Sequence, residues 1–183
     1  MSNYILISAL LGLCIGSFLN VIIYRVPRGK GIIFTRSNCP SCERKLQPID
    51  LIPLISWFFL KGKCRFCKTK IGFIYPFVEV LTGLTFILCL LSAYRENSLV
   101  LIYSRMLFGW VLLSCLISIS FIDISHMIIP RQIIVFGSAS GIIFILTNCY
   151  LTSSNLFPKL LEGLYSALIA ILGTYFLNNL IEF

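Results

Sequence analysis

The chain has 183 residues, of which 58% are hydrophobic and 12% are charged, and its formal net charge is +8. Soluble globular domains carry about twice that share of charged residues, so the composition excludes a water-soluble fold and indicates a membrane protein. Ten of the fifteen Lys and Arg residues lie between Arg28 and Lys70. A basic segment between apolar spans is typical of a cytosolic loop facing anionic membrane lipid, and no aromatic platform or reading helix accompanies it to indicate nucleic-acid binding.

Five apolar stretches approach the roughly 20 residues that cross a bilayer as a helix. They cover residues 4–26, 75–94, 99–122, 133–151 and 160–181. We therefore expect an all-α polytopic membrane protein with about five transmembrane helices. Its regions are a first helix (1–26), a basic insert (27–74) and a further membrane region (75–183). Because positive charge stays in the cytosol, we expect the insert inside the cell and the N-terminus outside.

Small and polar residues recur at every fourth position of the first span: Gly12, Gly16, Asn20 and Tyr24. Small residues let two helices approach closely, and Asn20 can hydrogen-bond across such a contact. Pure packing and a role in an active region are both compatible with this stripe.

The insert contains two C-x-x-C pairs, Cys39 with Cys42 and Cys64 with Cys67. Each pair points two sulfurs at one centre, and two pairs complete the four-thiolate shell of a zinc ion. The alternatives are unligated thiols or two local disulfides, and a reducing cytosol disfavours the disulfides. Four thiolates leave no open coordination position, so we expect the zinc to be structural. The other four cysteines lie in apolar spans, where cysteine behaves as a small apolar residue.

Four segments, in order, resemble the prepilin leader peptidase and N-methyltransferase family. They are residues 16–27 (GSFLNVIIYRVP), the cysteine pairs with 53–57 (PLISW) between them, 75–79 (YPFVE) and 123–130 (DISHMIIP). The resemblance implies an intramembrane aspartic peptidase of the bacterial inner (plasma) membrane that cleaves type IV prepilin or pseudopilin substrates at the cytosolic face. It also implies that the insert takes part in methylating the new N-terminus with S-adenosylmethionine. One departure is Ile74, where the family commonly has arginine.

Asp123 ends the third apolar stretch, where an unpaired carboxylate is costly and therefore suggests function. Its plain alternative is a helix-end residue that reaches water. The resemblance makes Asp123 one of two catalytic aspartates, the second of which normally lies in a downstream Gly-x-Gly-Asp motif. The 183 residues contain no such motif, and their other aspartate, Asp50, belongs to the insert. We therefore expect a C-terminally truncated chain whose peptidase dyad is incomplete.

Glu79 lies near the start of the second span, where helix dipole and basic insert favour its ionised form. It either caps the helix or accepts the proton of the substrate amine before methyl transfer. The leading hypothesis is thus a peptidase and methyltransferase homologue. The alternative is a catalytically inactive membrane protein whose zinc insert binds a pilus or secretion-assembly partner. The residues leave the oligomeric state and the S-adenosylmethionine contacts open.

Overall fold

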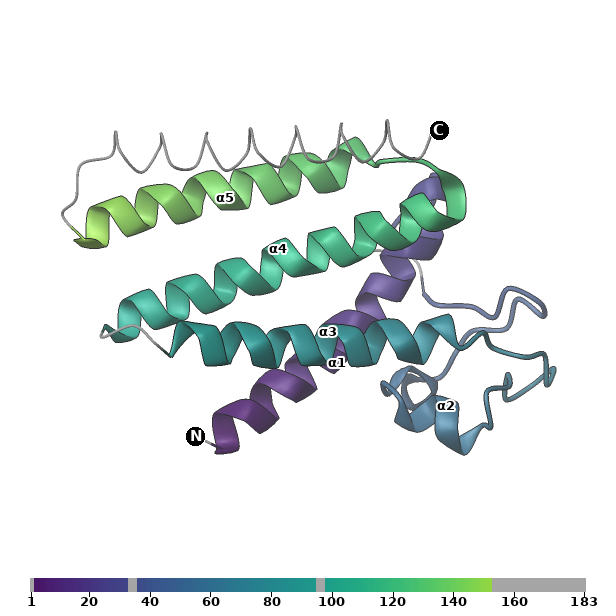
Figure 1. Ribbon diagram of the computed structural model, residues 1–183. Coiled ribbons are helices and arrows are strands. Elements are labelled where there is room, and N and C mark those ends of the chain that lie inside the picture. The colour runs from purple at the N-terminus through teal and green to yellow at the C-terminus, as the bar shows by residue number, and fades with distance from the viewer. Residues whose placement is uncertain (1, 33–35, 95–97, 153–183) are drawn as a thin grey trace, which may run out of the picture. The chain divides into compact units, whose positions relative to one another are not determined.

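The structure is a computed structural model, and it describes residues 2–32, 36–94 and 98–152. Figure 1 shows the helices, which are α1 (Ser2–Arg25), α2 (Ile55–Phe59), α3 (Ile74–Ala93), α4 (Leu99–His126) and α5 (Arg131–Thr152), with short 3-10 turns at Val26–Arg28 and Pro48–Leu51. Four of these, α1, α3, α4 and α5, are long and apolar enough to cross a membrane. The first four expected spans are confirmed, whereas the fifth (160–181) lies outside the described residues.

Residues up to Ser140 form one compact unit, which contains the insert, α1, α3, α4 and the beginning of α5. Residues 141–183 form the second unit. All contacts described below lie within the first unit.

Helices α1 and α3 approach closely, and glycines make the approach possible. A Cβ atom at Gly12 would lie 2.7 Å from the Gly83 Cα atom, and one at Gly16 would lie 2.7 Å from the Glu79 Cα atom. Asn20 donates a hydrogen bond from Nδ2 to the Tyr75 carbonyl at 3.0 Å, across the same contact. The stripe predicted from the first span is therefore the α3-facing side of α1, as small residues allow.

Helix α4 packs along α3 through aromatic side chains. The Phe86 and Trp110 rings stack with centroids 4.6 Å apart, and the Trp110 indole nitrogen donates to the Phe86 carbonyl at 3.1 Å. Near the insert, the Phe77 and Phe121 rings meet edge to face at 6.1 Å. The end of α4 therefore lies beside the second turn of α3.

Helix α4 is longer than the sequence predicted. The apolar run ends at Ile122, but the helix continues to His126 and is closed by Met127, whose φ is 50° and whose N–H donates to the Asp123 carbonyl at 2.8 Å. Asp123 is therefore a residue of the last helical turn, and the connection to α5 is correspondingly short.

The insert is tied to α1 by one buried arginine. The Arg25 guanidinium donates to the carbonyls of Gly31 at 3.1 Å, Ile32 at 3.3 Å and Arg36 at 3.1 Å. Because a buried guanidinium must satisfy its donors, these bonds fold the chain after α1 back over the end of that helix. At the other end of the insert, the Trp57 indole nitrogen donates to the Ile71 carbonyl at 3.3 Å.

Candidate functional site

The two cysteine pairs form matched turns. In the first, Cys39 N–H donates to the Arg44 carbonyl at 3.0 Å and Glu43 N–H donates to the Cys39 carbonyl at 2.9 Å. The second repeats this pattern: Cys64 N–H donates to the Thr69 carbonyl at 2.9 Å, and Lys68 N–H donates to the Cys64 carbonyl at 3.1 Å. Glu43 and Lys68 have φ angles of 57° and 59° at equivalent positions. Two equivalent turns thus present two sulfurs each.

The four sulfurs converge on one point. The Sγ atoms of Cys39, Cys42, Cys64 and Cys67 all lie within 4.8 Å of one another. The Cys39 and Cys67 sulfurs are 3.8 Å apart, which is far from a disulfide's bond length of about 2.05 Å. A tetrahedral ion with Zn–S bonds of about 2.3 Å requires sulfur pairs about 3.8 Å apart. The residues present therefore fit a four-thiolate metal site, as their spacing predicted.

The thiols of the cluster differ in acidity. The Thr69 hydroxyl, 3.2 Å from the Cys67 sulfur, helps to lower the pKa of Cys67 to about 6. Burial opposes ionisation of Cys39, but the backbone N–H groups of Cys42 and Ser41 bring its pKa below the usual value. At Cys42 the backbone at Arg44 favours the thiolate, yet burial and the neighbouring thiols raise the pKa to about 11. A cation at the centre would replace the remaining thiol protons.

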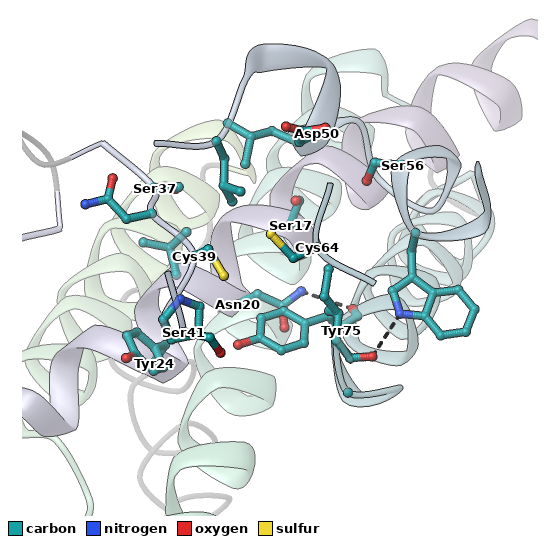
Figure 2. Close-up of a pocket in the computed structure, with 18 of the residues that line it drawn as sticks. Ser17, Asn20, Tyr24, Ser37, Cys39, Ser41, Asp50, Ser56, Cys64 and Tyr75 are labelled. Atoms are coloured by element: carbon teal, nitrogen blue, oxygen red, sulfur yellow. Dashed lines mark hydrogen bonds between the residues drawn. The ribbon is translucent and has the colours of Figure 1, made fainter. Parts of the chain in front are cut away.

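A cavity of about 820 Å³ lies between the cysteine turns and the ends of α1 and α3. Figure 2 shows Asn20 and Tyr24 from α1, Tyr75 from α3, and Cys39 and Cys64 from the insert around one hollow. Its volume falls in the range of about 300–1,000 Å³ that is typical of small-molecule sites. The insert and the membrane helices thus enclose a space that neither could form alone.

Glu79 lies at the membrane end of this cavity. Its residue surface is 8% exposed, and its Oε2 atom accepts a hydrogen bond from the backbone N–H of Leu54 at 2.8 Å. Leu54 has φ 59° and ψ −50°, and Ile55 N–H donates to the Pro53 carbonyl at 2.6 Å. This is a γ-turn with positive φ, a rare and strained conformation. A carboxylate of the span therefore holds a strained turn of the insert.

The Asp50 carboxylate is already bonded to other residues of the insert. Its side chain is 3% exposed and forms an ion pair with Arg65 at 2.8 Å. Its second oxygen accepts the Gln47 backbone N–H at 3.1 Å. These bonds give Asp50 a structural role at the edge of the cavity.

Asp123 is exposed in the last turn of α4 and is not among the residues that line the cavity. The Phe77–Phe121 contact nevertheless puts it on the same side of the spans as Glu79. The two predicted carboxylates therefore lie at the same end of neighbouring helices, but of the two only Glu79 lines the cavity. Sequence reasoning missed Arg25 and Leu54, because their contacts are made to or by backbone groups, which leave no side-chain signal.

Comparisons with known proteins cover most of the chain. Residues 10–93 match the family described as "Bacterial Peptidase A24 N-terminal domain", and residues 110–182 match the "Type IV leader peptidase family". The chain is 42% identical over 140 residues to a "Prepilin leader peptidase/N-methyltransferase" of Myxococcus xanthus (strain DK1622), covering 72% of this chain and 37% of the relative.

Two further relatives show the same likeness. A "Type 4 prepilin-like proteins leader peptide-processing enzyme" of Escherichia coli O78:H11 is 38% identical over 142 residues, covering 65% of this chain and 48% of the relative. A "Prepilin leader peptidase/N-methyltransferase" of Neisseria gonorrhoeae is 31% identical over 194 residues, covering 92% and 65%. The chain spans about half the length of the first relatives. No solved structure matches.

Proposed function

The chain belongs to the type IV leader peptidase family of bacterial membrane proteins, and we propose from this premise that it processes type IV prepilins or pseudopilins in the plasma membrane. The amino terminus of the cleaved protein is methylated in the cavity next to Glu79. Asp123 contributes to the cleavage of the leader. The observation that carries the proposal is the cavity, because it joins the four-cysteine insert to a buried carboxylate of the span.

The cavity suits S-adenosylmethionine in size and chemistry. It has room for a molecule of this class together with a short peptide end. Tyr75 offers an aromatic ring and Glu79 a carboxylate, both of which favour a sulfonium cation. When bound, S-adenosylmethionine supplies an electrophilic methyl group to an amine nitrogen.

Glu79 is proposed as the proton acceptor. An α-amine is nucleophilic only after it has lost its ammonium proton, and a carboxylate within hydrogen-bond reach can take that proton. With the methyl donor bound, the amine nitrogen would form its N–C bond as the donor's S–C bond breaks, and Glu79 would hold the proton taken from the amine. Leu54 N–H holds one Glu79 oxygen at 2.8 Å, which orients the carboxylate for this task.

The zinc ion is proposed to hold the insert in shape. Cys39, Cys42, Cys64 and Cys67 fill a tetrahedral shell, so the metal has no position left for a substrate. The same turns form one wall of the cavity. Metal binding therefore maintains the methyl-transfer site without taking part in the chemistry.

Asp123 is proposed as one member of an aspartic peptidase pair. Such a pair shares one proton, so that one carboxylate activates water and the other polarises the scissile carbonyl. Asp50 cannot serve as the second member, because Arg65 and Gln47 already occupy its oxygens. The second carboxylate must therefore be a group other than Asp50.

Both sites are proposed to face the cytosol, because the insert carries most of the positive charge. An impermeant amine reagent should then modify Lys45 and Lys68, which are exposed, only after the membrane is opened. Modification in intact spheroplasts would reverse the orientation.

Replacement of Glu79 tests the methyl-transfer proposal. Membranes containing the chain, labelled S-adenosylmethionine and a peptide with a free N-terminal phenylalanine should yield a labelled α-amine. Glu79→Gln retains an oxygen that can accept the Leu54 N–H but is a poor base, so we expect the rate to fall about 10²–10⁴-fold. Glu79→Ala also removes the hydrogen bond that holds the insert.

The comparison of these two variants separates catalysis from docking. Glu79→Gln should leave the proteolysis pattern of the insert unchanged, whereas Glu79→Ala should make residues near Leu54 easier to cleave. Full methyl transfer by Glu79→Gln would refute the proposed base. No methyl transfer by the unmodified chain would instead favour an insert that only binds a partner.

A further inference from the structure

The insert carries an exposed apolar surface that the proposed chemistry does not use. We call it the α2 patch, and it consists of Ile55, Phe58 and Phe59 of α2 with Phe73 just before α3. Their residue surfaces are 52%, 67%, 84% and 67% exposed, respectively. Three phenylalanines this exposed on a small polar segment mark an interaction surface.

The depth of the α2 patch follows from its attachment to α3. Helix α3 has 20 residues, which at about 1.5 Å per residue gives about 30 Å, the thickness of the hydrocarbon core. Glu79 is five residues beyond Ile74 and so lies about 7–8 Å inside the start of this span. Because Leu54 N–H bonds to the Glu79 carboxylate, the residue before α2 lies within one side chain's length of that depth, on the insert side. Figure 1 shows α2 beside the first turns of α3.

The α2 patch also continues an outer surface of α3. The Phe73 ring contacts Trp57 at 5.9 Å and Phe77 at 6.5 Å, between ring centroids. Phe77 belongs to the span and is 47% exposed. These ring contacts therefore connect Phe77 on the outer surface of α3, through Phe73, to Trp57 of α2.

Basic residues follow the α2 patch at its edge. Lys61 and Lys63 come directly after α2 and are both exposed. Lysines beside an apolar helical surface place their ammonium groups at phospholipid headgroups while the apolar side chains enter the acyl boundary. The positive charge of Lys61 and Lys63 beside the α2 patch therefore complements the phosphate groups of a phospholipid surface.

We propose that the α2 patch is an interfacial membrane anchor, embedded in the leaflet on the side of the insert. Phe58 and Phe59 enter the boundary between headgroups and acyl chains, and Lys61 lies at the phosphates. Trp57 and Ser56 of the same short helix line the 820 Å³ cavity. The membrane thereby holds one wall of that cavity in place. This anchor does not depend on the proposed reaction.

Photo-crosslinking tests the anchor without touching the native cysteines. The full chain carrying p-benzoylphenylalanine in place of Phe59 is reconstituted in vesicles of phosphatidylethanolamine and phosphatidylglycerol and irradiated. Intact-mass analysis then counts phospholipid adducts. Phe66 is the matched control, because it is an exposed phenylalanine of the same insert that lies on the second cysteine turn under the Arg44 guanidinium, 5.3 Å from its ring centroid.

We expect several-fold more lipid adduct from position 59 than from position 66, and the same from position 58, which serves if the first variant fails to fold. Equal adduct yields at positions 59 and 66 would overturn the anchor. So would a crosslink from position 59 to a second protein chain in place of lipid, since that result would make the α2 patch a protein interface.

Discussion

Glu79 and Asp123 are carboxylates at the same end of neighbouring helices, yet their surroundings differ. Glu79 is 8% exposed, accepts a 2.8 Å hydrogen bond from Leu54 and lies against the backbone of α1 at Gly16. Asp123 is exposed in the last turn of α4. Within residues 2–32, 36–94 and 98–152, no hydrogen bond or ion pair involves its side chain.

This difference separates the two halves of the proposed function. A catalytic group must be held by its neighbours before the substrate arrives, because positioning contributes much of the rate. The described residues hold Glu79 in this way and enclose a cavity over it. They supply only one carboxylate of the pair that peptide hydrolysis needs. The described residues therefore assemble the proposed methyl-transfer site, whereas the proposed peptidase site requires a further carboxylate.

Loss of the metal should disrupt the proposed methyl-transfer site at Glu79 most strongly and leave the helix end that carries Asp123 in place. Structural zinc sites contribute about 10–16 kcal/mol to the folding of small domains. Among the described residues of the insert (27–32 and 36–74), the buried hydrophobic ones are Cys39 and Cys64. We expect Cys42→Ser with Cys67→Ser to lose the single equivalent of zinc, to expose the insert to proteases and to abolish methyl transfer. Elemental analysis and limited proteolysis of purified protein would measure this.

The matched control for the metal prediction is Cys14→Ser, which changes an exposed cysteine of α1 outside the cluster. Its zinc content and proteolysis pattern should equal those of the unmodified chain. Full zinc retention by the double variant would show that these thiols do not hold the ion. A chelator should reproduce the effect of the double variant while the helical circular dichroism of the spans persists.

The proposed peptidase site at Asp123 should not cleave a prepilin when the 183-residue chain is tested alone. Removing one positioned acid or base costs about 10²–10⁴-fold, and members of a pair that act together are not additive. We expect membranes with this chain to bind a prepilin without shortening it, as measured by gel shift. Joining a family-like segment with a Gly-x-Gly-Asp motif should restore cleavage, and Asp123→Asn should abolish it again.

Efficient cleavage by the 183 residues alone would contradict the contrast drawn between Glu79 and Asp123. It would mean that another carboxylate, from this chain or from a second copy, completes the site at Asp123. Retention of cleavage after Asp123→Asn in the extended chain would remove Asp123 from the mechanism altogether.

Much of the fold was predictable because its causes are local in the sequence. Apolar runs predicted the four described spans, and the C-x-x-C spacing predicted the sulfur cluster. The glycines of α1 predicted a close helix contact and Asn20 a hydrogen bond across it, as the structure has them. These predictions depend on residue types, such as paired cysteines and helical glycines, that have few other structural roles in such patterns.

The parts that sequence reasoning missed depend on backbone groups or on distant packing. The bond from Leu54 N–H to Glu79 leaves no trace in the identity of Leu54, and the three carbonyls that Arg25 binds belong to residues of no special type. The extra turn of α4 through Asp123 follows from the αL conformation of Met127, a residue that seldom marks a helix end. The apolar content alone would have ended that helix at Ile122.

The smallest predicted effect concerns the glycine that lies behind Glu79. Replacing glycine by alanine in a helix normally stabilises it by about 0.5–1 kcal/mol, through the entropy of the unfolded chain. At Gly16 the new Cβ atom would lie 2.7 Å from the Glu79 Cα atom, so the two backbones must separate. Overpacking of this kind costs about 1–3 kcal/mol, which outweighs the gain in helix propensity.

Gly137→Ala is the control for this substitution. It lies in α5, where a Cβ atom would meet only Cys115 atoms at 3.7 Å, an ordinary contact distance. We expect Gly16→Ala to lower the unfolding midpoint in detergent and Gly137→Ala to leave it unchanged or raise it. Because separation of α1 from α3 also shifts Glu79, Gly16→Ala should slow methyl transfer while zinc content stays the same. Equal midpoints and equal methyl-transfer rates for the two variants would show that α1 does not position Glu79, and the carboxylate would then be held by the insert alone.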